Sequence, residues 1–224
     1  MTEDRNGAGL HESFREMTTH ERCLLSPEQA VKIFEDGIAM TTIIGIAGSL
    51  RRKSYNAMLL RAAVELAPSQ TIVQSASIQG IPLYDGDLEV QSGLPASVHE
   101  MKDRIAKADG LLLVTPEYNN SLPGVFKNAI DWLSRPPEDI GRVFRNRPVA
   151  LMGATPGSGG TILAQTAWLP VLRTLGMRPW FGARLHVSGA DKVFDANGNL
   201  VDKRVQQQVQ SFMAGFIEII ERSR

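Results

Sequence analysis

The sequence predicts an α/β fold in which a doubly wound parallel sheet of five strands lies between two layers of helices. Short apolar segments alternate with longer amphipathic segments over most of the 224 residues, and this alternation is typical of parallel sheets covered on both faces. One short segment, GLLLVT at residues 110–115, is almost entirely apolar, as expected of a strand that is buried on both faces.

The expected elements follow one another in strand–helix order. The strands are expected at residues 42–48, 71–77, 110–115, 147–154 and 178–187. The helices are expected at residues 54–67, 96–108, 123–134, 161–175 and 203–220. The second strand alternates in polarity, which favours a place at the edge of the sheet. A turn at residues 195–198, between the last strand and the last helix, can form the tip of a small hairpin.

Residues 1–40 differ from the rest and are predicted to be a partly disordered extension of a single domain at residues 41–224. Residues 2–20 are polar and charged, a composition that does not favour order. Residues 26–29, SPEQ, form a capping box with proline at the first helical position, which predicts a short helix. Met40 directly precedes the first strand. It is either a translation start after a leader, or the end of an arm that docks on the domain or a neighbouring subunit.

Composition excludes several classes of function. Lys and Arg number 24, as do Asp and Glu, so the formal net charge is zero and attraction to nucleic acid or anionic lipid is not indicated. Cys23 is the only cysteine, which excludes an internal disulfide and a cysteine-rich metal site. The four histidines lack metal-ligand spacing, and no apolar run can span a bilayer. We therefore expect a cytoplasmic protein without a metal, a nucleic-acid partner or a membrane partner.

The most informative stretch is IIGIAGSLRRKSYN at residues 43–56, in which a strand turns sharply into a helix. Such a turn gathers backbone N–H groups and the positive end of a helix at one point, which favours an anion. The loop adds basic and hydroxyl groups from Ser49, Arg51, Arg52, Lys53 and Ser54. It matches neither a P-loop nor the dinucleotide fingerprint. The remaining candidate for the bound anion is a monophosphate, and FMN is the common ligand of that kind in doubly wound sheets. An ordinary turn with solvated basic residues is the alternative.

Two further loops follow expected strands. PEYNNSLPG, at residues 116–124, follows the third strand, and the glycine-rich ATPGSGG, at residues 154–160, ends the fourth. Ligands of such sheets bind at the carboxyl ends of the strands, and glycine permits the backbone to approach a flat ligand closely. The convergence of three loops at one edge indicates a binding site there.

Three segments resemble the NADPH-dependent FMN reductase family, and within it the soluble bacterial quinone and chromate reductases. They are GSLRRKSYN, IPLYDGDL at residues 81–88, and TPEYNNSLPGVFKNAIDWLSR at residues 115–135. The resemblance extends from residue 41 to the C-terminus. It implies a flavodoxin-like fold, non-covalent FMN, NADPH or NADH as electron donor, and a homodimer or homotetramer.

The resemblance also implies roles for individual residues. The FMN phosphate would be held by Ser49, Arg51, Ser54 and Asn56, with help from the backbone N–H of Tyr55. The isoalloxazine ring would be lined by Pro116, Glu117, Tyr118 and Asn119, with Thr155 and Gly157 near the ring. No side chain is assigned a catalytic role with certainty, because the flavin carries the chemistry. The chain departs from close relatives at Leu163, where they carry an arginine at a subunit contact, and at Asn120, where some carry an aromatic residue.

The expected function is therefore that of an FMN-dependent NAD(P)H oxidoreductase that passes electrons to a quinone, free flavin or a similar small acceptor. The alternative is a flavodoxin-type electron carrier that reduces no substrate of its own. Such carriers are typically very acidic, whereas this chain is charge-balanced.

Overall fold

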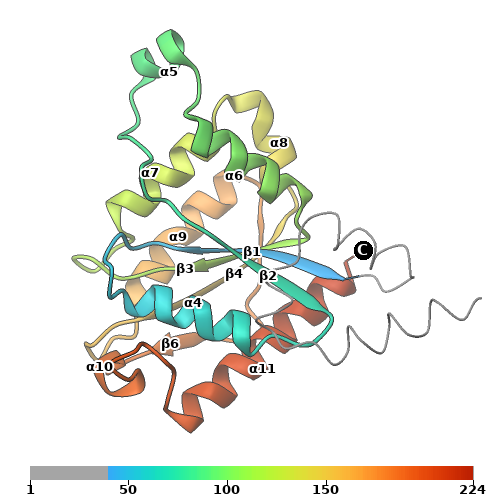
Figure 1. Ribbon diagram of the computed structural model, residues 1–224. Helices are drawn as coiled ribbons and strands as arrows, with labels where there is room; N and C mark the ends of the chain where they lie inside the picture. The colour runs from blue at the N-terminus through green and yellow to red at the C-terminus, as the bar shows by residue number, and fades with distance from the viewer. Residues whose placement is uncertain (1–39, 224) are drawn as a thin grey trace, which may run out of the picture.

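A computed structural model describes residues 40–223. Within this range a parallel sheet lies between two layers of helices, and the α/β class expected from the sequence is confirmed (Figure 1). The short helix expected from the SPEQ capping box lies outside the described residues, as do the other expectations for residues 1–39.

The sheet has six strands in place of the expected five. They are β1 (Thr41–Ala47), β2 (Thr71–Ala76), β3 (Gly110–Val114), β4 (Pro148–Ala154), β5 (Arg178–Pro179) and β6 (Leu185–Val187). The order is β2-β1-β3-β4-β5, β6 also pairs with β4, and all pairs are parallel. β2 lies at the edge, as its alternating sequence predicts, and every residue of β3 is buried.

The prediction of one continuous strand at residues 178–187 is wrong. This segment forms two short strands, β5 and β6, and the chain between them does not pair with β4. β5 pairs with the start of β4, and β6 pairs with its last three residues. The N–H of Trp180 still donates to Val149 O. The indole ring then turns onto Phe212 and Phe216, with ring centroids 5.0 and 5.8 Å away. Gly182 passes so close to this ring that a Cβ would lie 2.5 Å from Nε1. The packing of Trp180 therefore interrupts the strand.

Helices cover both faces of the sheet (Figure 1). One face packs against α4 (Tyr55–Glu65), α10 (Ala190–Val193) and α11 (Lys203–Glu221). The other face packs against α6 (Ala96–Lys107), α7 (Gly124–Leu133), α8 (Ile140–Val143) and α9 (Ile162–Thr174). The long helices agree with the expected ranges to within two residues at each end. The sequence did not predict α8, α10, the 3₁₀ turn η1 (Pro137–Asp139) or α5 (Gly86–Ser92). In Figure 1, α5 extends away from the sheet.

An ion pair between a buried lysine and a partly exposed aspartate supports the α6 side of the molecule. Lys102 is 1% exposed, and its Nζ lies 2.8 Å from a carboxylate oxygen of Asp139. The same ammonium donates to the carbonyl oxygen of Arg135. Hydrogen bonds from Arg142 and Lys102 hold the pKa of Asp139 well below its usual range.

The hairpin expected near residues 195–198 is also present. Phe194 and Leu200 form an antiparallel bridge, and the N–H of Gly198 donates to the carbonyl oxygen of Asp195. Gly198 has a positive φ of 81°, which explains why glycine stands at this position of the turn.

Candidate functional site

The three loops that the sequence singled out meet at the carboxyl ends of β1, β3 and β4, which are neighbours in the sheet. The N–H of Gly48, just after β1, donates to Val114 O at the end of β3 over 2.9 Å. The N–H of Thr115 donates in turn to Met152 O in β4. Beyond the strands, Ser49 Oγ lies 3.2 Å from the hydroxyl oxygen of Tyr118. The predicted convergence is therefore present in the structure.

Gly48 opens the first loop, which we call the phosphate loop (residues 48–54), at a place where the backbone passes close to a buried ring. A Cβ on Gly48 would lie 2.1 Å from the ring of the buried Phe126. At the other end of the loop, Ser54 caps α4, and its hydroxyl accepts from the N–H of Ala57. The position of this cap leaves the N–H groups at the start of α4 directed toward the loop.

The charge around the phosphate loop is positive. Arg51, Arg52 and Lys53 are exposed, and the first turn of α4 contains no acidic residue. Within residues 40–223, none of these three side chains takes part in an ion pair. The backbone N–H of Arg51 donates to Ser49 Oγ, which shapes the loop. A positive helix end, uncompensated cations and hydroxyl groups together favour an anion at this place.

Asn56 and Tyr55 make contacts that the sequence did not predict. Asn56 is 3% exposed, and its amide nitrogen donates to Ala154 O while its amide oxygen accepts from Ala154 N, both at 2.9 Å. Its side chain thus joins α4 to the end of β4, which differs from the expected phosphate contact. The ring of Tyr55 stacks on the ring of Phe194, with the two ring centroids 6.1 Å apart.

The second loop is a hairpin whose tip consists of two asparagines. The N–H groups and carbonyl oxygens of Tyr118 and Ser121 exchange two hydrogen bonds of 3.1 Å. Asn119 and Asn120 have positive φ angles of 50° and 59°. A two-residue turn with positive φ at both positions is the type that matches the twist of a hairpin, and asparagine tolerates it.

Two contacts hold the base of this hairpin, one of them buried and the other partly buried. The hydroxyl of Thr115 donates to Pro116 O over 3.0 Å and accepts from the indole N–H of Trp168 over 3.1 Å. A carboxylate oxygen of Glu117 accepts from the N–H of Ala164 in the first turn of α9 over 3.0 Å. A carboxylate at a helix N-terminus stabilises that end. Glu117 therefore positions the loop against α9.

The third loop connects β4 to α9. The N–H of Thr155 donates to Val187 O, and the Thr155 hydroxyl accepts from the N–H of Gly157 over 3.3 Å. Gly160 has a positive φ of 57°, and a Cβ there would lie 2.7 Å from Cβ of His186. Burial lowers the pKa of His186, which favours the uncharged form of the imidazole beneath this loop.

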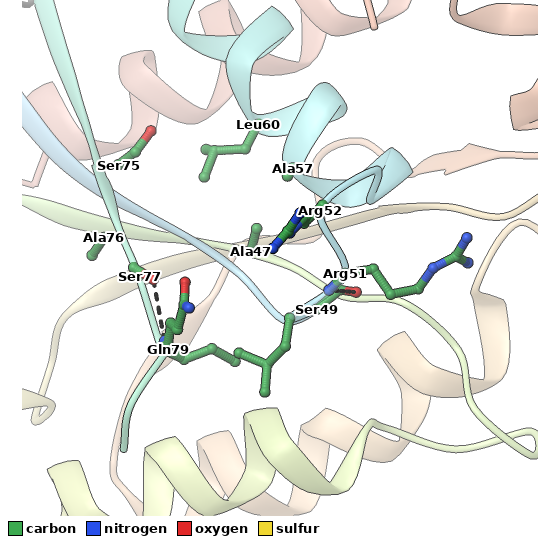
Figure 2. A pocket seen from close by; sticks show the side chains of 12 residues that line it. Ala47, Ser49, Arg51, Arg52, Ala57, Leu60, Ser75, Ala76, Ser77 and Gln79 are labelled. Atoms are coloured by element: carbon green, nitrogen blue, oxygen red, sulfur yellow. Dashed lines mark hydrogen bonds between the residues drawn. The ribbon is translucent and has the colours of Figure 1, made fainter.

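A pocket of about 480 Å³ lies beside the phosphate loop, on the side of β2 (Figure 2). Its walls come from the ends of β1 and β2, the phosphate loop and one flank of α4. No residue of the second or third loop lines it.

The described residues contain neither a cluster suited to a metal ion nor a helix suited to a membrane. No group of three or more histidine, cysteine, aspartate or glutamate side chains comes together there in a way that could hold a metal ion. None of the described helices is long and apolar enough to cross a bilayer.

Comparison with known proteins places this geometry in a family. Residues 41–191 match the sequence profile of NADPH-dependent FMN reductase. The chain belongs to the NADPH-dependent FMN reductase family. An NAD(P)H-dependent FMN reductase of Pseudomonas aeruginosa is 42% identical over 173 residues, which is 75% of this chain and 91% of that protein. A 2-hydroxy-1,4-benzoquinone reductase of Burkholderia sp is 40% identical over 168 residues, or 75% of this chain and 90% of that protein.

A solved structure agrees with this assignment to the NADPH-dependent FMN reductase family. The flavoenzyme NAD(P)H:(acceptor) oxidoreductase FerB of Paracoccus denitrificans is 32% identical, with a TM-score of 0.73. The match covers 82% of this chain and 98% of that one. The flavodoxin-like fold and the family resemblance expected from the sequence are therefore confirmed.

Proposed function

We propose that this chain is an FMN-dependent NAD(P)H oxidoreductase that reduces quinones. The observation that carries the proposal is the meeting of a cationic phosphate loop with two further loops at the ends of β1, β3 and β4. Ligands of doubly wound sheets bind at this place, where the strand order reverses between β1 and β3. The names of the related proteins support a flavin cofactor and a quinone acceptor.

The residues present fit FMN. The phosphate would be held by the hydroxyl of Ser49, the guanidinium of Arg51, Ser54 and the backbone N–H of Tyr55. This donor set suits a monophosphate, because it combines charge, hydroxyl groups and a helix N-terminus without a nearby carboxylate in the first turn of α4. The side chain of Asn56 is 3% exposed and is bonded to Ala154 through one amide N–H and the amide oxygen, so we leave it out of this set.

The ring end of the cofactor would lie against the second and third loops. Pro116, Glu117, Tyr118 and Asn119 would border it mainly through backbone groups, and Thr155 and Gly157 would border its edge. The Glu117–Ala164 contact and the Thr115–Trp168 contact keep this border in place. Bound FMN would supply hydride acceptance from NADPH or NADH and electron transfer to the acceptor, while the protein orients the reactants and excludes competing reactions.

The same proposal extends to assembly and location. We infer a homodimer or homotetramer in the cytoplasm that takes small-molecule acceptors. Support comes from large apolar side chains left on the surface of the described chain, among them Phe181 at 70% exposure and Ile162 and Leu163 at 49% each. Light scattering after size exclusion would give the subunit number.

The first test concerns the cofactor. Purified protein is heated, and the released chromophore is identified by chromatography. FMN is expected, because one phosphate loop serves a monophosphate. FAD, or no flavin even after reconstitution with FMN, would overturn the assignment.

The second test separates the enzyme from an electron carrier. Oxidation of NADPH by a benzoquinone is followed at several concentrations of each. Since donor and acceptor need the same open side of the ring, they should bind in turn, and double-reciprocal plots should be parallel. Intersecting lines would contradict the shared pocket, and no oxidation of NADPH or NADH would favour the flavodoxin-type carrier.

A further inference from the structure

The pocket beside β2 adjoins the place proposed for the flavin phosphate, because Ser49 and Arg51 belong to both. It shares Ser49, Leu50, Arg51 and Arg52 with the phosphate loop, but its other walls are Ala57 and Leu60 on the flank of α4 and residues 75–79 at the end of β2. Ser54, Tyr55 and the ring-lining residues do not line it. The part of the pocket between the flank of α4 and the end of β2 is bounded by none of the residues assigned to FMN, and it is open to another group.

The pocket has a polar, cationic rim and an apolar floor. The polar side chains are those of Ser49, Arg52, Ser75, Ser77 and Gln79, and no carboxylate lines the pocket. Its apolar side chains are those of Ala47, Leu50, Ala57, Leu60, Ala76 and Ile78. A flat base fits against such a floor, and a phosphate fits at such a rim.

Arg52 is the charged group that serves this pocket. Figure 2 shows its side chain lying near Ala47 and Ala57, whereas the side chain of Arg51 extends away from the pocket. Within the part of the chain that the structure describes, the Arg52 guanidinium makes no hydrogen bond or ion pair. The two arginines thus point to different places, Arg51 away from this pocket and Arg52 into it.

We propose that this pocket binds the adenosine end of the electron donor and that Arg52 recognises its 2′-phosphate, so that the enzyme prefers NADPH over NADH. The inference rests on the proposed function. A volume of about 480 Å³ suits a base and a phosphorylated ribose, and a guanidinium can bind a phosphate through two hydrogen bonds. Ser49 connects the pocket to the ring-lining loop, because its hydroxyl lies 3.2 Å from that of Tyr118. A donor can therefore place its adenosine end here and its nicotinamide end at the ring.

The kinetic test compares both donors with the same quinone in Arg52→Gln. KM for NADPH should rise roughly tenfold, the effect of losing a charge-assisted contact, and the NADPH-to-NADH ratio of kcat/KM should fall by the same factor. Lys53→Gln is the matched control, since it removes one positive charge from the same exposed loop without touching the pocket lining. That control should change the ratio by less than about twofold. Equal changes for both donors in Arg52→Gln, or no change, would overturn the assignment.

A binding test uses adenosine 2′,5′-bisphosphate and calorimetry on the FMN-loaded protein. Arg52→Gln should weaken its binding roughly tenfold, and 5′-AMP, which lacks the 2′-phosphate, should bind wild type correspondingly more weakly. In turnover the bisphosphate should compete with NADPH. Inhibition that does not compete with NADPH would mean a separate site for a free nucleotide and would overturn the donor assignment. Absence of turnover with either donor would count against the proposed function, whereas calorimetry would still report on the pocket.

Discussion

Replacement of Asn56 should weaken the fold at the point where the phosphate loop is joined to β4. Its amide makes two hydrogen bonds of 2.9 Å with the backbone of Ala154, and both residues are 3% exposed. Asn56→Ala removes both bonds and leaves the N–H and the carbonyl of Ala154 without these partners in a buried place. A hydrogen bond contributes about 0.5–1.5 kcal/mol, and a buried group without a partner costs about 1–3 kcal/mol. The free energy of unfolding should therefore fall by about 2–4 kcal/mol.

Urea denaturation measures this loss of unfolding free energy. Asn56→Asp is a second variant that tests the same two hydrogen bonds. The aspartate keeps an acceptor for the N–H of Ala154 but places a carboxylate oxygen against the carbonyl oxygen of Ala154. This repulsion should raise the folded-state pKa of the new carboxyl above its unfolded value. Its protonated form can donate to that carbonyl, so the stabilising contact is present at low pH and is lost as the pH rises through the folded-state pKa.

Two results would refute this reasoning. One is a loss below about 0.5 kcal/mol in Asn56→Ala, which is the range of a surface substitution. The other is a stability of Asn56→Asp that runs parallel to that of wild type between roughly pH 4 and pH 7, since the repulsion predicts a smaller deficit in acid.

Other residues make further tests possible. Arg51→Ala and Ser54→Ala should each raise the FMN dissociation constant roughly ten- to a hundredfold; unchanged constants in a flavin fluorescence titration would remove the phosphate assignment. A chain that starts at Met40 should fold, bind FMN and turn over normally, because β1 begins at the next residue; a large loss of stability in urea would show that residues 1–39 dock. Asp139→Ala should cost about 3 kcal/mol of unfolding free energy, more than Lys102→Met, because it leaves a buried ammonium without its carboxylate; equal losses would contradict this. Because neighbouring cations hold the pKa of Asp139 low, wild type should lose stability as the pH falls through the acid range, and Asp139→Ala should lose less.

The long elements could be predicted from the sequence because their signals are local. Apolar periodicity placed the helices, and the serine before α4 and Pro68 after it marked the ends of that helix. The short helices α5, α8 and α10 have four to seven residues, which is too few for a periodic pattern. The break between β5 and β6 depends on the contact of Trp180 with α11, which no local pattern contains.

The position of the candidate site could be predicted, but the partners of its polar groups could not. Strand order alone brings loops that follow β1, β3 and β4 to one edge. Asn56, however, meets Ala154 across 98 residues of chain, and Glu117 meets Ala164 across 47. A motif assigns such residues a ligand, whereas the fold can use the same side chain to join two elements. Only the tertiary structure separates the two roles.

The Asn56–Ala154 and Glu117–Ala164 contacts join the first two loops to the same segment, which also contains the third loop. Asn56 ties the phosphate loop to the end of β4, Glu117 ties the hairpin to the start of α9, and the third loop is itself the connection between β4 and α9. The same segment is closely packed at Gly153 in β4. A Cβ on Gly153 would lie 2.3 Å from Thr115 O and 2.1 Å from Thr161 Oγ1. Residues that hold the proposed phosphate and residues that border the proposed ring are thus positioned by the same segment. A change in the β4–α9 connection should therefore alter phosphate and ring contacts together, even where the altered residue touches neither.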